Sequence, residues 1–138
     1  MAGTQAVYYR ERDGREPVDE FIAGLKPAAV QEAIDTKCDL LNGLPLDAPP
    51  LAFPHSSQIE GQLRELRCRL GKRLFRVLYR RSGNLFVLLH AIEKNTAAVP
   101  SADIAIAKAR FTEFQARMNL APRVPPRAAG HDAPPNTR

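Results

Sequence analysis

The spacing of apolar and polar residues along the chain predicts where strands and helices lie. Three runs have the pattern of strands: residues 62–70 and 73–81, in which apolar and charged residues intersperse, and residues 84–92, which are very apolar. Gly71-Lys72 and Ser82-Gly83 stand at the joints between these runs, and such short glycine-containing joints favour hairpin turns. The pattern predicts a three-stranded antiparallel meander. The β-prone residues 5–11 are expected to add a strand at one edge, which makes about four strands.

Helical spacing precedes and follows this meander. Pro17 suits the first turn of one helix, and Pro27 begins a second helix that runs to about Leu41, so residues 17–41 predict an N-terminal helical hairpin. Pro100 and Ser101 open a C-terminal helix to about Asn119. The predicted fold class is therefore α+β.

Proline content divides the rest of the chain. Residues 44–61 contain four prolines and are predicted to be a loop across a surface of the domain. Residues 120–138 contain five prolines and almost no bulky apolar residue, so we expect a disordered tail there. The predicted domain thus spans residues 1–119.

Composition excludes several classes of protein. The 138 residues are 44% hydrophobic, which suits one domain with a real core, yet no apolar run approaches the roughly 20 residues that cross a membrane. The first nine residues lack the build of a secretory signal. Two cysteines without a CxxC motif indicate a thiol-reduced, cytoplasmic protein. Neither a metal nor a small-molecule cofactor is expected, because the Cys and His residues never fall at ligand spacing.

Charge is distributed unevenly. Residues 1–61 carry 5 basic and 10 acidic side chains, whereas residues 62–94 carry 9 basic and 2 acidic ones. A basic block of this kind suggests a polyanion such as nucleic acid as partner. The alternative interpretation is an ordinary solvated sheet face.

Alternation along the predicted strands places arginines together. Arg67, Arg69 and Arg76 fall on one face, opposite the apolar residues of the same strands. Because neighbouring guanidinium groups repel one another, such a face is expected to be wet or to bind an anion. The alternative is a solvated sheet in which Glu65 pairs with one arginine.

One histidine is a candidate for acid–base chemistry. His90 lies on the last predicted strand and is either a packed core residue or a group that acts near neutral pH. Arginines with one histidine suit RNA cleavage, because RNA supplies its own nucleophile, the 2′-hydroxyl. Fixed cations would stabilise the phosphorane, and the products would be a 2′,3′-cyclic phosphate and a 5′-hydroxyl.

Several motifs together resemble the RelE/HigB toxin superfamily, and most of all its phage-derived HigB-like branch. They are Leu66-Arg-Cys-Arg-Leu-Gly, Phe75-Arg-Val-Leu-Tyr79, and Phe86-Val-Leu-Leu-His-Ala-Ile-Glu-Lys94 followed by Pro100 and an amphipathic helix. The resemblance covers about residues 5–118. It implies a RelE-like fold and the toxin of a type II toxin–antitoxin pair, a ribosome-dependent mRNA endonuclease (mRNA interferase) that inhibits translation.

The resemblance also implies roles for particular residues. Arg76 would stabilise the transition state, with His90 as acid or base and Lys94 as a further basic group of the catalytic site. RNA and phosphate binding would fall to four residues: Arg67, Arg69, Lys72 and Arg73. Implied partners are mRNA on the ribosome, with contacts to ribosomal RNA, and a cognate antitoxin, often a helix-turn-helix protein.

Two other functions stay open on the same fold. ParE-like relatives inhibit DNA gyrase without cutting RNA, although that activity gives no reason to cluster arginines. The second open function is that of a catalytically degenerate toxin, which binds only an antitoxin or RNA. It is favoured by Glu93, which replaces a lysine of the family pattern and is expected beside the anion site, and by the absence of a C-terminal tyrosine.

Overall fold

The computed structural model describes residues 3–120 and 125–132. Its helices are α1 (Pro17–Ala23), α2 (Ala28–Asp39), α3 (Ser101–Met118) and a short 3-10 helix, η1 (Gly130–Asp132). Its strands are β1 (Gln5–Tyr8), β2 (Ser56–Glu60), β3 (Leu63–Leu70), β4 (Arg73–Ser82) and β5 (Leu85–Glu93). The predicted meander and all three predicted helices are present, with ends that differ by one or two residues at most positions. The predicted N-terminal helical hairpin differs in detail, because α1 packs mainly on β5 and α2 mainly on β3.

The sheet has five strands in the order β1-β5-β4-β3-β2. It is mixed, because β1 runs parallel to β5 while the other pairs are antiparallel. The prediction of about four antiparallel strands was therefore wrong in number and in the direction of β1. The extra strand, β2, lies in the segment predicted to be a loop. It is a short edge strand that begins just after Pro54 and pairs on one side only, with β3.

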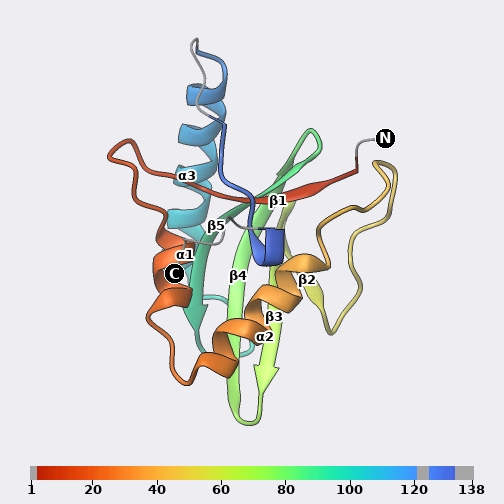
Figure 1. The fold of residues 1–138 in the computed structure, drawn as a ribbon, viewed down its shortest axis with the longest axis vertical. Coiled ribbons are helices and arrows are strands. Elements are labelled where there is room, and N and C mark those ends of the chain that lie inside the picture. The colour runs from red at the N-terminus through yellow and green to blue at the C-terminus, as the bar shows by residue number, and fades with distance from the viewer. Residues whose placement is uncertain (1–2, 121–124, 133–138) are drawn as a thin grey trace.

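Helices α1 and α2 cover one face of the sheet, and α2 lies across β3 and β4 in Figure 1. The apolar positions of the meander point to these helices, as predicted: Leu66, Cys68, Phe75, Val77 and Tyr79. Helix α3 packs on the opposite face through Ala107, Phe111 and Phe114. No helix within the described residues is long and apolar enough to span a membrane.

The C-terminal segment 125–132 folds back onto β1, where Figure 1 shows it in dark blue. The Tyr8 amide donates to the Arg127 carbonyl at 2.9 Å, and the Ala129 amide donates to the Ala6 carbonyl at 2.9 Å. Arg127 forms an ion pair with Glu16 at 2.7 Å. For these residues the expectation of disorder was wrong, because backbone pairing and ion pairs replace the missing apolar burial. Residues 121–124 and 133–138 lie outside the described residues, and the boundary at residue 119 stays a prediction.

Two consecutive residues fasten this segment to α2. His131 lies between two carboxylates, with Nε2 2.8 Å from Glu32 Oε2 and with Nδ1 against Asp39. Hydrogen bonds to these carboxylates raise the pKa of His131, that from Asp39 most. Gly130 has a φ of +71° and lies so close to α2 that a Cβ there would be 2.4 Å from Asp39 Oδ1. Glycine is therefore favoured at this point.

Candidate RNA-binding face

Helix α3 covers only part of its sheet face, and the polar end of that face lies toward the β3–β4 turn. The strand register defines three rows of neighbouring side chains there: Glu65, Leu78 and His90; then Arg67, Arg76 and Ile92; then Arg69, Leu74 and Lys94. Adjacent strands are about 4.8 Å apart, so residues in one row are direct neighbours. The structure thus brings Arg67, Arg69, Arg76 and Lys94 onto one face, as the alternation predicted for the three arginines.

Arg76 is enclosed in the middle of these rows and only 1% exposed. Its Nε donates to Glu65 Oε1 at 2.6 Å, and its Nη1 donates to the Thr96 carbonyl at 2.6 Å. Its Nη2 donates to Glu65 Oε2 at 3.3 Å and to the Ala97 carbonyl at 3.2 Å. The loop that joins β5 to α3 therefore closes over the guanidinium. This corrects the expectation that Arg76 faces a phosphate directly, because its donors are already used within the protein.

Glu65 holds two arginines at once. Its Oε2 also accepts hydrogen bonds from Ser57 Oγ at 2.7 Å and from Arg67 Nη1 at 3.3 Å. Burial alone would raise the pKa of the Glu65 carboxyl, but the hydrogen bonds from Arg76 and Ser57 and the nearby positive charges outweigh it, so the pKa is lowered. The sequence suggested that Glu65 pairs with one arginine, and in the structure it pairs with two. One carboxylate against two guanidinium groups leaves a net positive charge.

Three cations of this face reach solvent, and we call Arg67, Arg69 and Lys94 the basic face. Arg67 is partly exposed and Arg69 and Lys94 are exposed. Arg69 Nη1 donates to Asn95 Oδ1 at 3.2 Å, and Asn95 Nδ2 donates to the Lys72 carbonyl at 3.1 Å. These bonds join β3, the β3–β4 turn and the loop after β5. The exposed cations can therefore meet a phosphate without rearrangement of the fold.

The two basic residues of the β3–β4 turn separate. Lys72 is exposed at the turn, beside the basic face. Arg73 points to the opposite face of the sheet, the one covered by α1 and α2. There its Nε lies 2.7 Å from Glu93 Oε2 and its Nη1 donates to the Lys26 carbonyl at 3.0 Å. Arg73 was expected to bind RNA together with Arg67 and Arg69, but the alternation of β4 places it on the other side of the sheet. The same pairing takes Glu93 away from the basic face, which corrects the expectation of a carboxylate beside the anion site.

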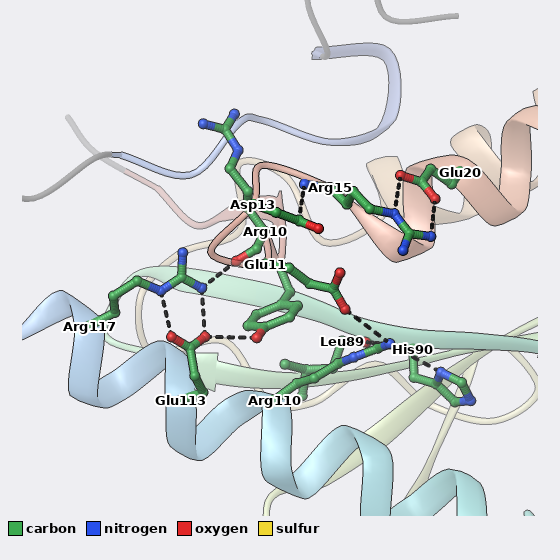
Figure 2. Close-up of polar contacts among 11 residues, drawn as sticks. Arg10, Glu11, Asp13, Arg15, Glu20, Leu89, His90, Arg110, Glu113 and Arg117 are labelled. Carbon is green, nitrogen blue, oxygen red and sulfur yellow. Dashed lines mark hydrogen bonds and ion pairs between the residues drawn. The ribbon is translucent and has the colours of Figure 1, made fainter.

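His90 is neither an apolar core residue nor a free one. Its Nε2 lies 2.7 Å from Asp103 Oδ1 and its Nδ1 lies 3.3 Å from Arg110 Nη1, as Figure 2 shows for the arginine side. A guanidinium only donates, so Nδ1 accepts, and the hydrogen-bond network assigns the ring proton to Nε2. An aspartate that orients a neutral imidazole is an arrangement suited to a general base. In this structure Arg110 fills the place where a substrate hydroxyl would bind Nδ1.

Helix α3 is fixed by a polar cluster that the sequence did not reveal (Figure 2). Tyr9 Oη donates to Glu113 Oε1 at 2.7 Å, and Arg117 Nη2 contacts the same oxygen at 2.6 Å. Burial and the hydrogen bond to Glu113 raise the pKa of Tyr9 to about 12. Arg110 adds a bond to the Leu89 carbonyl at 2.8 Å. Arg117 and Glu113 are four residues apart on α3, but Tyr9 is 104 residues from Glu113 and Leu89 is 21 residues from Arg110, so no local motif marks the whole cluster.

Two further residues near the basic face also escaped the sequence analysis. Asp103 belongs to the first turn of α3, where an acid complements the helix dipole, and that ordinary role hides its contact with His90. Phe53 lies in the proline-rich segment, and Arg67 Cζ is 5.1 Å from the centre of its ring. Among the described residues no group of three or more His, Cys, Asp or Glu side chains could hold a metal ion.

Comparison with known proteins identifies the family. The model of the family described as phage derived protein Gp49-like (DUF891) matches residues 21–112, which include β2 to β5 and every residue of the basic face. No curated protein matches the chain. Since the match covers two thirds of the sequence, the chain belongs to the Gp49-like phage-derived family, a family of RelE/HigB-like toxins.

Proposed function

We propose that this protein is the toxin of a type II toxin–antitoxin pair and that it cleaves mRNA on the ribosome. The observation that carries the proposal is the basic face, on which Arg67, Arg69 and Lys94 project from the β3 strand and the end of β5. Membership of a RelE/HigB-like toxin family supports the toxin role. Lys72, at the adjoining turn, extends the positive surface toward ribosomal RNA.

The proposed reaction uses the nucleophile that RNA carries. The 2′-hydroxyl oxygen attacks the adjacent phosphorus and loses its proton, the bond to the 5′-oxygen breaks, and that oxygen takes up a proton. The products are a 2′,3′-cyclic phosphate and a 5′-hydroxyl. Cations of the basic face stabilise the charge that develops on the phosphorane oxygens. His90 accepts the hydroxyl proton at Nδ1 once Arg110 turns from it, and DNA is not cut because it lacks the nucleophile.

Arg76 then acts as a positioning residue. It fixes Glu65 with Nε–Oε1 at 2.6 Å, and Glu65 in turn holds Arg67 at 3.3 Å. A carboxylate held on one side keeps the Arg67 guanidinium in place for a phosphate on the other. The proposed antitoxin is a small helix-turn-helix protein encoded beside the toxin, and it neutralises the toxin by binding it.

A second candidate is a toxin of this family that binds RNA without cutting it. The specific observation in its favour is that Arg76 is closed off by Glu65 and the loop carbonyls while both ring nitrogens of His90 have partners. In that case the basic face retains its ligand but no group assists the proton transfers.

A reconstituted translation reaction with a defined mRNA tests the proposal. The wild-type protein is expected to produce RNA fragments with 2′,3′-cyclic phosphate ends, and the variant R67A/R69A/K94A is expected to produce none. R73A is the matched control, because Arg73 lies on the other face of the sheet. Binding of ribosomes without any cleavage indicates the second candidate, and inhibition of gyrase supercoiling without either contradicts both.

A further inference from the structure

Phe53 is the most exposed large apolar side chain in the described part of the chain, at 70%. It is not on a loose segment. The His55 and Ser56 amides both donate to the Ala52 carbonyl, at 3.0 and 3.2 Å, which closes a tight turn around Phe53. The Arg67 amide donates to the His55 carbonyl at 2.9 Å, which ties the turn to β3. The fold thus holds an aromatic ring in solvent at a defined place.

The ring is placed directly beside the basic face. The Arg67 guanidinium carbon lies 5.1 Å from the ring centre, so one face of the ring meets a cation while the high exposure leaves the rest open. Arg67 Nη1 also donates to Glu65 Oε2 at 3.3 Å. The same guanidinium is therefore held by a buried carboxylate and contacts an exposed ring.

The surroundings of the ring are positive. Lys37 Nζ, from the last turn of α2, lies 3.1 Å from Nδ1 of His55, which belongs to the turn around the ring. Arg69 follows Arg67 two residues along the same strand face. Glu65, the acid that contacts Arg67, is buried and already paired. An anionic partner with flat apolar groups fits this surface better than an apolar protein segment does.

We propose that Phe53 is a stacking platform for one base of single-stranded RNA, whose neighbouring phosphate binds Arg67. This inference rests on the proposed function and adds a residue that contacts the base. Stacking on an aromatic side chain tolerates any base, since every base has a π-face. Phe53 therefore contributes affinity and positions the strand, and it does not select a sequence.

The test uses a fluorescently labelled single-stranded RNA that is 2′-O-methylated throughout, so that it cannot be cleaved. Fluorescence anisotropy at low salt is expected to show about tenfold weaker binding by F53A, as for the loss of one stacked base. F53W, which keeps a stacking surface, is expected to bind like the wild type. L120A is the matched control, because Leu120 is also 62% exposed but lies just beyond α3.

A second readout reports stacking itself. With 2-aminopurine placed in the RNA, the wild type and F53W are expected to quench its fluorescence on binding, and F53A is expected not to. Unchanged affinity and quenching in F53A, with binding lost in R67A/R69A, overturns the inference but leaves the proposed function standing. That result would assign Phe53 to a protein partner such as the antitoxin. Absence of binding to the free RNA by the wild type overturns the inference, whereas the proposed function is overturned only by absence of cleavage in the reconstituted translation reaction.

Discussion

Arg76 and Glu65 form a buried ion pair across β3 and β4, with Nε 2.6 Å from Oε1 and side chains that are 1% and 5% exposed. The pair lies under the loop that leads into α3 and directly beside Arg67. It therefore links the stability of the sheet to the geometry of the basic face.

Removal of one partner is expected to be costly. In R76M the Glu65 carboxylate stays buried but loses the ion pair with Arg76 that offsets its desolvation. We therefore expect a loss of about 3–5 kcal/mol in the free energy of unfolding. Urea denaturation measures this loss. The double variant R76M/E65L is expected to be more stable than R76M alone, because no buried charge is left unpaired.

The matched control for that experiment is the exposed pair of Arg73 and Glu93, whose side chains are 38% and 37% exposed. R73M is expected to lose much less free energy of unfolding than R76M, since solvent screens the exposed pair. Equal losses in R76M and R73M would contradict the expectation that burial makes removal of Arg76 the more destabilising change.

Low pH is expected to lower the free energy of unfolding through protonation of Glu65. Its pKa is lower in the folded protein than the ordinary 4.5, so the unfolded chain binds the proton more readily. The stabilisation is complete above the unfolded pKa and is lost as the pH falls through the folded pKa. The free energy of unfolding, measured from about pH 7 to pH 3, is expected to fall less steeply in E65Q than in the wild type. Identical slopes would contradict this.

High pH is expected to destabilise the docking of residues 125–132 on α2, because His131 loses its proton. Its pKa is raised above 6.5 by the hydrogen bonds to Asp39 and Glu32, so its contribution is present below the unfolded pKa and is lost as the pH rises through the folded pKa. Hydrogen exchange of residues 125–132, corrected for the intrinsic pH effect, is expected to accelerate across that range. H131Q, which cannot titrate, is expected to show no such step, and a step of the same size in H131Q would contradict the assignment.

A comparison of alanine variants at Gly130 and Gly14 distinguishes the cost of backbone strain from the cost of a steric clash. Both Gly130 and Gly14 have positive φ angles, +71° and +94°, but only Gly130 has a neighbour within 4 Å of an added Cβ. Both alanine variants incur strain of about 1 kcal/mol. G130A is also expected to push the segment from Asp39, so its melting temperature is expected to fall further than that of G14A. Equal melting temperatures would show that the segment adapts without cost.

The sequence predicted the elements whose signal is local and periodic. The alternation in β3 and the position of Arg76 in β4 allowed the common side of Arg67, Arg69 and Arg76 to be predicted, whereas β5 was recognised as a strand from its apolar run. Strand β2 could not, because its five residues follow a proline-rich stretch and only its pairing with β3 makes it a strand. The folding back of residues 125–132 onto β1 likewise depends on ion pairs with residues more than 100 positions away.

The candidate site was predictable as a set of charges but not as a geometry. Alternation alone does not show that the loop at residues 96–97 closes over Arg76, nor that Glu65 is shared between two guanidinium groups. The side taken by Arg73 was predictable, because alternation in the predicted strand 73–81 places it with Phe75 and opposite Arg76. Phe53 carries no signal in the sequence, because its importance comes from the strand that passes beside it.

The salt dependence of RNA binding tests the central claim, that Arg67, Arg69 and Lys94 bind phosphates. Each phosphate contact with a single strand contributes about 0.7 to the slope of log affinity against log salt. We expect R67A/R69A/K94A to reduce the slope by about 2, and R12A, which removes the 80% exposed Arg12 side chain, to leave it unchanged. An unchanged slope in the triple variant, with a folded protein, would contradict the account.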